Sequence, residues 1–365
     1  MGLLVLLSWE LGEFAERGRR TRAMVVSVVL LALAGCVAVT HLQLRHWQSS
    51  LTLFQHALDV TANNRVAHNN LGIALAEAQC GDEAIAHYRE ALRLASNYDD
   101  ARINLGLALT GRGELDEAQR EFSTVLEQRP NAQAHVALGN VFERRRQMEE
   151  AVREYRAALA LRPADAYAHF NLANVLSGKN EFAEALVHYV AALQAKPDWA
   201  VARFKLGVAL TRLGKAKEAL AQFEAAAQLD PSLAEAHLHA GLALVAEGRT
   251  QPALEHLRRA VALKPDGVEG LDRFAWLLAT HPDAQFRDGK EAVRLATHAA
   301  EVTKSSDAAT LSILAAAFAE AGRFPEAIST AKQARELALA SGQKEFGERI
   351  QSHLQQYESG QPCRK

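Results

Sequence analysis

The sequence predicts an all-α protein in which one transmembrane helix precedes a solenoid of antiparallel helix hairpins. Three observations support this fold class. The 365-residue chain is rich in strong helix formers, above all Ala and Leu, whereas β-branched and aromatic residues are sparse beyond the first segment. One uncharged apolar run lies near the N-terminus. A pattern with a period of about 34 residues then governs the rest of the chain, and such an array can stay continuous because each hairpin contacts only its neighbours.

The apolar run predicts a membrane helix over residues 23–42. Residues 23–40 carry no charge, and at ~1.5 Å rise per residue they nearly cross a ~30 Å hydrocarbon core, with the next two residues extending the helix at the interface. Arg17, Arg19, Arg20 and Arg22 precede the run, and only Arg45 follows closely. Residues 1–22 are thus a short apolar run followed by an arginine-rich loop, and the positive-inside rule places this loop in the cytoplasm and the repeats outside it, in a periplasmic location.

The apolar segment has three interpretations, of which an uncleaved membrane helix is the first. Residues 2–9 form an apolar run too short to span a membrane, which indicates the end of an earlier helix and a start cut from a longer polytopic ancestor. Leu33-Ala34-Gly35-Cys36 resembles the lipobox of bacterial lipoproteins, so a lipidated Cys36 is a second interpretation, and a cleaved signal peptide is a third. All three place the repeats outside the cytoplasm.

Six consecutive copies of the repeat occupy residues 65–267. In the first helix of a copy, a leucine precedes a glycine that we expect to admit a close backbone approach, as in Leu71-Gly72, Leu105-Gly106, Leu138-Gly139 and Leu206-Gly207. The second helix carries a small residue and then a large one that we expect to fill the gap to the following repeat. The small residues are Ala84, Ala118, Ala151, Ala185, Ala219 and Ala253, and the large ones are Tyr88, Phe122, Tyr155, Tyr189, Phe223 and Leu257.

These positions resemble the tetratricopeptide repeat (TPR) family. The resemblance implies helix hairpins stacked into a right-handed superhelix, with the first helices lining its concave side. Around the six copies, residues 47–64 are predicted to be an incomplete first repeat, residues 268–340 two divergent repeats, and residues 343–365 a capping helix and tail.

The N-terminal part adds a second resemblance. A last membrane helix followed by a W-x-x-S-x-x-LF-x-x-AL start, from Trp47, loosely resembles the membrane-to-repeat junction of bacterial transmembrane-and-TPR O-mannosyltransferases. The catalytic membrane region of those proteins is absent from this chain, so the resemblance supplies no activity. It does suggest a membrane glycosyltransferase as a partner, or a chain that is the C-terminal fragment of such an O-mannosyl- or O-GlcNAc-transferase-like system.

The outward stripe of the first helices is the predicted partner-binding face. Its candidate residues are Asn70, Asn104, Asn140, Phe170, Asn171, Asn174, Phe204 and Lys205. Amides and a lysine beside two aromatic rings suit an extended peptide, although Phe170 and Phe204 could instead pack between repeats. Asn70, Asn104 and Asn171 share one repeat position, which resembles the asparagine ladder of O-linked N-acetylglucosamine transferase repeats.

A partial resemblance to chaperone-binding carboxylate clamps is broken by Val136 and Val201, which stand where those clamps carry lysines. Cytosolic chaperone binding is therefore not expected.

Other function classes find little support. The net charge of −2 leaves no basic surplus for nucleic acid. The three cysteines are spaced neither as a zinc site nor as a disulfide framework. The histidines at one repeat position, His68, His135, His169 and His237, would lie about 8–10 Å apart on packed helices, too far to share one metal.

No phosphate-binding loop, dinucleotide fingerprint, nucleophile elbow or metalloprotease motif occurs, so neither catalysis nor a cofactor is predicted. The sequence therefore predicts a membrane-anchored scaffold that binds protein or peptide partners.

Overall fold

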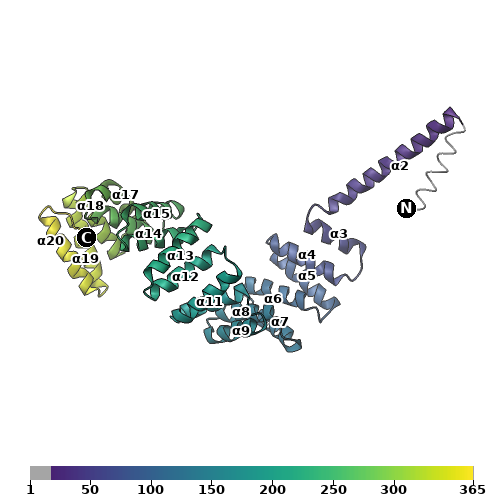
Figure 1. Ribbon diagram of the computed structural model, residues 1–365, viewed down its shortest axis with the longest axis horizontal. Helices are drawn as coiled ribbons and strands as arrows, with labels where there is room; N and C mark the ends of the chain where they lie inside the picture. The colour runs from purple at the N-terminus through teal and green to yellow at the C-terminus, as the bar shows by residue number, and fades with distance from the viewer. Residues whose placement is uncertain (1–17, 365) are drawn as a thin grey trace. The chain divides into compact units, whose positions relative to one another are not determined.

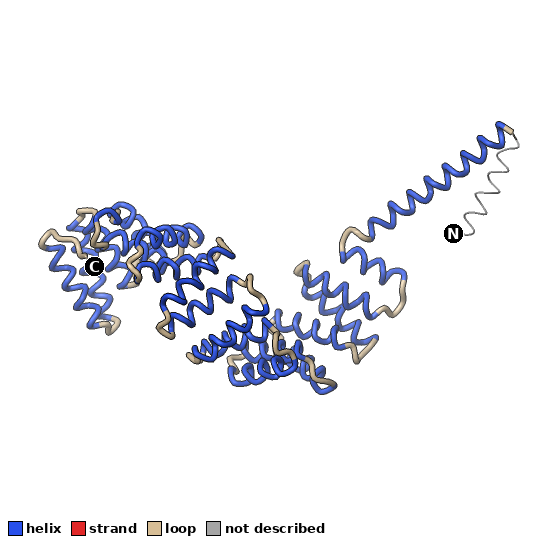
Figure 2. The backbone as a smooth tube through the Cα atoms, viewed as in Figure 1, coloured by secondary structure: helices blue, strands red, loops and turns tan. Residues whose placement is uncertain are grey.

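The structure is a computed structural model, which describes residues 18–364. Within that range it contains nineteen α-helices, one short 3-10 helix and no strand, which confirms the all-α prediction (Figure 2). The chain divides into two compact units, the first ending at Leu161 and the second beginning at Arg162. Each unit is described by itself.

The first unit is built from the N-terminal helix and three complete hairpins (Figure 1). Its helices are α2 (Arg19–His46), α3 (Ser50–Val60), α4 (Arg65–Glu77), α5 (Gly81–Leu94), α6 (Asp99–Arg112), α7 (Leu115–Gln128), α8 (Ala132–Arg144) and α9 (Met148–Leu161). The two helices of each hairpin, α4 with α5, α6 with α7 and α8 with α9, pack against each other.

The second unit continues the hairpins and ends in a single helix. Its elements are α10 (Ala166–Gly178), α11 (Phe182–Ala195), α12 (Ala200–Arg212), α13 (Ala216–Leu229), α14 (Ala234–Ala246), α15 (Thr250–Leu263), α16 (Val268–Thr280), η1 (Ala284–Phe286), α17 (Gly289–Val302), α18 (Ala308–Glu320), α19 (Phe324–Ala340) and α20 (Lys344–Glu358). The 3-10 turn η1 lies in the loop between α16 and α17.

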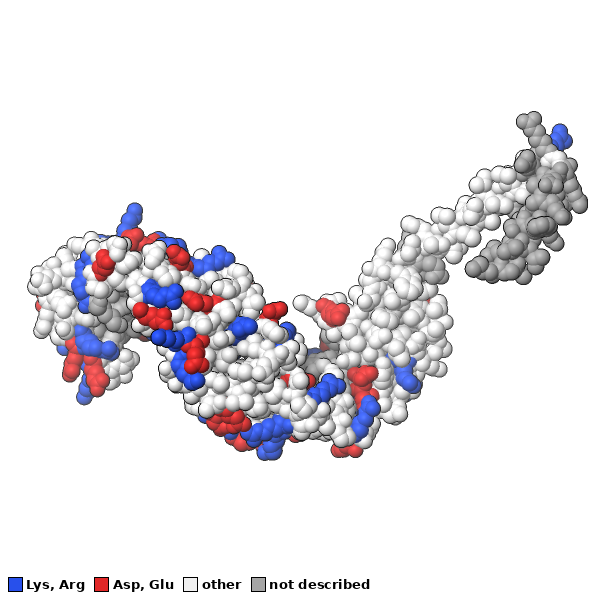
Figure 3. Space-filling view, in the orientation of Figure 1, with Lys and Arg blue, Asp and Glu red and all other residues white. Residues whose placement is uncertain are grey.

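Helix α2 has the length and composition of a membrane span. Its segment Ala23–His41 has a mean hydropathy of 2.6 and none of it is buried. The surface of this segment is uncharged, while acidic and basic side chains are interspersed on the visible face of the repeats (Figure 3). The helix is longer than the predicted span, since it begins at Arg19 and continues to His46. A signal sequence near an N-terminus has the same features.

The first helices carry glycines that touch aromatic rings. The pairs are Gly72 with Tyr88, Gly106 with Phe122, Gly139 with Tyr155 and Gly207 with Phe223. A Cβ atom at Gly139 would lie 2.6 Å from a ring carbon of Tyr155, which is far inside van der Waals contact. The glycine thus makes room for a ring of its own hairpin, which corrects the expectation that it admits a backbone. The Phe223 ring also lies 5.2 Å from His239 of the following hairpin, as expected for a residue that fills the gap to the next repeat.

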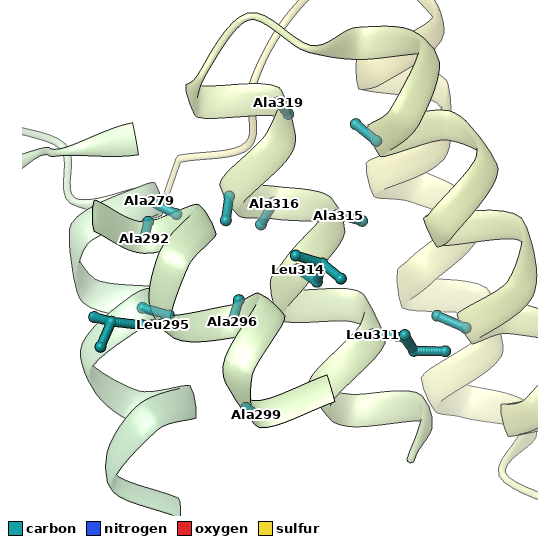
Figure 4. Packing of buried hydrophobic residues seen from close by; sticks show 14 of the residues in the cluster. Ala279, Ala292, Leu295, Ala296, Ala299, Leu311, Leu314, Ala315, Ala316 and Ala319 are labelled. Atoms are coloured by element: carbon teal, nitrogen blue, oxygen red, sulfur yellow. The ribbon is translucent and has the colours of Figure 1, made fainter. Parts of the chain in front are cut away.

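Small residues let the two helices of each hairpin approach. The second-helix alanines Ala84, Ala118, Ala151, Ala185, Ala219 and Ala253 are all at most 1% exposed. In the second unit, the cluster that runs from Leu254 to Cys363 is dominated by alanines and leucines, several of which are seen between the helices in Figure 4. Close packing of small side chains brings neighbouring backbones together and leaves little free volume.

The C-terminal end of the array is covered by α20 and a short tail. Ile350, Leu354 and Tyr357 of α20 are buried against the preceding hairpin. After α20 the chain turns back, and the Tyr357 hydroxyl donates a hydrogen bond to the buried Sγ of Cys363 at 3.5 Å. Arg364 then donates to the carbonyl of Ala279 at 3.3 Å, which fixes the tail on α16.

Candidate partner-binding site

Two of the predicted asparagines in the first unit belong to one chain of amides. The Asn104 Nδ2 donates to Asn69 Oδ1 at 2.9 Å, and the Asn69 Nδ2 donates to Asn70 Oδ1 at 3.2 Å. Asn69 is only 3% exposed and links the first helices α4 and α6. The sequence analysis missed Asn69. It could have been found because Asn69 is polar, whereas the same position in other repeats holds apolar residues such as Ile103 and Phe170.

Asn140 and Asn174 each satisfy a buried tyrosine of their own hairpin. The Tyr155 hydroxyl donates to Asn140 Oδ1 at 2.7 Å, and the Tyr189 hydroxyl donates to Asn174 Oδ1 at 2.8 Å. Burial raises the pKa of the Tyr155 hydroxyl above its usual range, and the neighbouring Glu143 carboxylate raises it further. These two asparagines therefore have a structural role, since an unpartnered buried hydroxyl is costly.

A cavity of about 640 Å³ lies between the first helices α6 and α8 of the first unit. Asn140 lines it together with Leu107, Thr110 and Arg144. The Arg144 guanidinium donates to the carbonyl of Thr110 at 2.6 Å, which holds this cation at the wall. Leu107 is 42% exposed, so the cavity offers an apolar surface beside polar groups.

The two phenylalanines that were predicted to bind a partner, Phe170 and Phe204, pack against aromatic neighbours. The Phe204 ring is only 9% exposed, and its centroid lies 5.3 Å from that of His239 and 5.9 Å from that of Phe223. The Phe170 ring lies 4.3 Å from Trp199 and is partly buried. Most of the Phe204 surface is thus used within the array, in line with the packing alternative for this residue.

An exposed aromatic cluster surrounds Phe170 and was not foreseen. Tyr167 is 56% exposed, and its ring lies 5.1 Å from Trp199. The Lys196 Nζ sits 5.2 Å from the Tyr167 centroid and 4.9 Å from the Trp199 centroid, a cation–π arrangement. Asn171, the neighbour of Phe170 on α10, is partly buried.

Lys205 is the most accessible of the predicted residues in the second unit. It is exposed on α12, with its Nζ 5.9 Å from the centroid of the Phe204 ring. Of the eight predicted residues, Asn70, Asn104 and Asn140 belong to the first unit and the other five to the second.

The repeated histidines pair with the second helix of their own hairpin. The Nδ1 atoms lie 3.0 Å apart in His68–His87, 2.9 Å apart in His169–His188 and 3.1 Å apart in His237–His256, and His135 contacts Glu154 at 2.6 Å. Burial lowers the pKa of three of them below the usual value, namely His87, His237 and His256. Across residues 18–364 no group of three or more His, Cys, Asp or Glu is placed to hold a metal ion.

Comparison with known proteins identifies the class of this chain. The model of the tetratricopeptide repeat family matches residues 38–99, 103–166, 147–200, 170–234 and 204–268. The chain therefore belongs to the tetratricopeptide repeat family, as its repeat pattern predicts.

Two curated relatives show partial similarity. A stretch of 182 residues is 24% identical to "Protein O-mannosyl-transferase Tmtc3" of Drosophila melanogaster, which covers 44% of this chain and 19% of that protein. A stretch of 77 residues is 35% identical to the "Peroxisomal targeting signal receptor" of Candida glabrata, covering 21% of this chain and 13% of the receptor. This chain thus matches less than a fifth of the length of either relative. The similarity to Tmtc3 supports the resemblance to repeat-bearing O-mannosyltransferases.

Solved structures share the fold. The Cut9–Hcn1 hetero-tetramer of the APC/C aligns with a TM-score of 0.53 at 19% identity, covering 61% of this chain and 44% of that one. PilF of Pseudomonas aeruginosa aligns with a TM-score of 0.54 at 19% identity, covering 58% of this chain and 96% of PilF. The human IFIT1 dimer with PPP-AAAA aligns with a TM-score of 0.50 at 16% identity, covering 79% of this chain and 67% of the IFIT1 chain. At these identities the likeness is one of fold alone.

Proposed function

We propose that this chain is a membrane-anchored scaffold that binds protein or peptide partners through the first helices of its hairpins. The tetratricopeptide fold suits such a role because stacked hairpins present an extended surface. The observation that carries the proposal is the cavity between α6 and α8, where exposed Leu107 lies beside Asn140 and Arg144. Sites for protein and peptide ligands combine such apolar area with a few fixed polar groups.

The proposed binding residues have different parts in this surface. Asn70 and Asn104, joined through Asn69, form an amide chain whose donors and acceptors suit a peptide backbone. In the second unit, exposed Lys205 and partly buried Asn171 and Phe170 form the corresponding surface. Asn140, Asn174 and Phe204 support it from beneath through their tyrosine and aromatic contacts.

Photo-crosslinking in membranes tests which face binds. We expect benzoylphenylalanine at Leu107 or Lys205 to trap a partner, because both positions are exposed on first helices. The matched control is Val187, which is 61% exposed but lies on the second helix α11. Adducts are identified by mass spectrometry. Equal yields from Val187, or no adduct from either first-helix position, would contradict the proposal.

We also propose that α2 anchors the chain in a membrane with the repeats outside the cytoplasm. The support is the uncharged segment Ala23–His41 together with the excess of arginine before it. A reporter that is active only outside the cytoplasm, fused after Trp47, should be active, and a reporter that is active only in the cytoplasm should be silent at the same position. The reverse pattern overturns the orientation.

The mass of the mature protein distinguishes the three forms of anchor. An unprocessed N-terminal segment without lipid is expected for a membrane helix, lipid on Cys36 for a lipoprotein, and loss of the whole segment for a cleaved signal.

A second candidate function is a non-catalytic accessory, or C-terminal fragment, of a membrane glycosyltransferase system. The observation that favours it is the similarity to Tmtc3 over 182 residues. An accessory should purify from membranes with one polytopic transferase in a fixed ratio, whereas a general scaffold should bring several unrelated partners. No catalytic role is proposed for this chain.

A further inference from the structure

A second cavity lies at the C-terminal end of the array, beyond the residues that match the repeat family. It has a volume of about 700 Å³ and lies between the helices α16, α18 and α20 and the C-terminal tail. The family match ends at residue 268, where α16 begins. This cavity therefore depends on what distinguishes this chain from its family: a divergent hairpin, a single last helix and a tail that folds back.

One wall of the cavity is apolar. Trp276 of α16, Ile313 of α18 and Phe346 of α20 line it, and all three are partly buried against the core below. The Trp276 ring lies 6.2 Å from His353, which keeps the indole beside α20. Burial, and secondarily the charge of Arg349, lowers the pKa of His353, so this imidazole adds no positive charge at neutral pH. The wall can receive one large apolar side chain.

The charged groups at the cavity are unevenly engaged. The Arg364 guanidinium is held by Glu320 at 2.6 Å, and Glu320 also contacts Arg287 at 2.9 Å. Asp272 is partly buried and also lines the cavity. Its Oδ2 accepts a hydrogen bond from the Thr310 hydroxyl at 2.8 Å, and its Oδ1 is buried without a hydrogen-bond partner among the described residues. The charges of Arg364 and Glu320 are thus paired with other residues of the protein.

Arg273 and Arg349 are left as the cations that face solvent. Both are exposed and line the cavity, and within residues 18–364 neither has a carboxylate at ion-pair distance. The Arg349 guanidinium lies 5.3 Å from the centroid of the Phe346 ring, which orients it beside the apolar wall. Glu269 is the one exposed carboxylate that lines the cavity, so the accessible groups carry a net positive charge.

We propose that this cavity binds an extended acidic segment of a partner protein, with one large apolar side chain seated between Trp276 and Phe346. Carboxylates on either side of that side chain pair with Arg273 and Arg349, since guanidinium groups recognise carboxylates with two parallel hydrogen bonds. The inference rests on the proposed function as a protein-binding scaffold and names the chemistry of one partner at a site of its own.

The test uses the full chain in detergent and fluorescence anisotropy of labelled hexapeptides. The acidic probe is Asp-Glu-Phe-Asp-Glu-Phe, the neutral probe replaces its acids by the matching amides, and the basic probe replaces them by lysine. We expect the acidic probe to bind at least about tenfold more tightly than the neutral one at physiological salt. Arg273→Gln and Arg349→Gln should each weaken it about tenfold, and Arg349→Glu should shift the preference towards the basic probe.

Lys332→Gln is the matched control, because Lys332 is an exposed cation on α19 that does not line the cavity. It should leave binding unchanged, and far-ultraviolet circular dichroism confirms that each variant is folded.

The proposal is overturned if the acidic and neutral probes bind alike, if neither binds, or if both arginine variants keep full affinity. Arginine-dependent binding of a single-stranded oligothymidylate as tight as that of the acidic probe would overturn the peptide assignment in favour of a general anion surface. Crosslinks from Leu107 and Lys205 report on other surfaces. If the crosslinks form but no probe binds, the C-terminal inference is wrong and the proposed function stands. If the probe binds but no crosslink forms, the proposed use of the first helices is wrong and the C-terminal site stands.

Discussion

Replacing Tyr155 with alanine should lower the free energy of unfolding of its hairpin by about 4 kcal/mol, the loss typical of truncating a large buried ring. The Tyr155 side chain is fully buried between α8 and α9 and lies directly on Gly139. Its removal leaves a cavity that the rigid helix pair cannot close, and it strips Asn140 of a hydrogen-bond donor at 2.7 Å. The loss should be local, because each repeat is stabilised by its own core and its neighbours.

Hydrogen exchange of the backbone amides in α8 and α9 measures the local loss of stability. Urea unfolding followed by circular dichroism measures the change in the free energy of unfolding of the whole protein. Tyr155→Phe is the control. It keeps the ring and removes only the hydroxyl, so it should cost about 1 kcal/mol through the hydrogen bond to Asn140. Equal losses for the two variants would mean that the hydroxyl, not the ring, stabilises the hairpin.

Gly106→Val should destabilise the first unit by about 3 kcal/mol, at the upper end of the cost of inserting volume into a packed core. A Cβ at Gly106 would lie 2.5 Å from a ring carbon of Phe122, which is fully buried. Valine is chosen over alanine because Ala173 occupies the equivalent position opposite Tyr189, where both side chains are buried. One methyl group can thus be accommodated, but a branched side chain adds two more.

Gly111→Ala, in the same helix, should change the stability in the opposite direction. No atom lies within 4 Å of a Cβ placed at Gly111, and its backbone is helical. Alanine there should stabilise α6 by about 0.4–1 kcal/mol, because it restricts the unfolded chain and favours the helix. Urea midpoints of the two variants should fall on opposite sides of the parent value. A stable Gly106→Val protein would show that Phe122 can move, and would refute the steric argument.

The fold was predictable because its determinants recur in the sequence. The spacing of residues such as Leu138 and Ala151 identifies the hairpins, and their near-complete burial confirms it. The role of the glycines that follow a leucine in the first helices was predicted wrongly, because each one faces an aromatic ring and not a backbone. Sequence spacing shows that Gly139 and Tyr155 belong to one hairpin, but it does not show that the ring lies over the glycine Cα. That contact depends on the rotamer and on how closely the helices approach.

The candidate site was predictable only in part, because its contacts join residues that share no repeat position. Asn69 connects Asn70 and Asn104, and Trp199 covers Phe170, through the way in which adjacent first helices and loops meet. The C-terminal cavity has no precedent in the preceding repeats, since Arg349 and the tail come from the segment that departs from the pattern. Periodicity identifies the residues that recur, whereas Asn69 and Trp199 stand at positions where the copies differ and Arg349 lies outside the copies.

The close contact between glycine and ring lies wholly inside one hairpin, at Gly72 and Tyr88 as at Gly207 and Phe223. Each of these glycines and its ring are therefore encoded within one repeat. A DNA segment that encodes one hairpin can be copied, lost or recombined without separating a glycine from its ring, and the new junction needs only the looser fit between neighbours. Unequal crossing-over can therefore change the length of this protein in steps of one hairpin, and selection can then alter single side chains in a duplicated copy to give it a new partner.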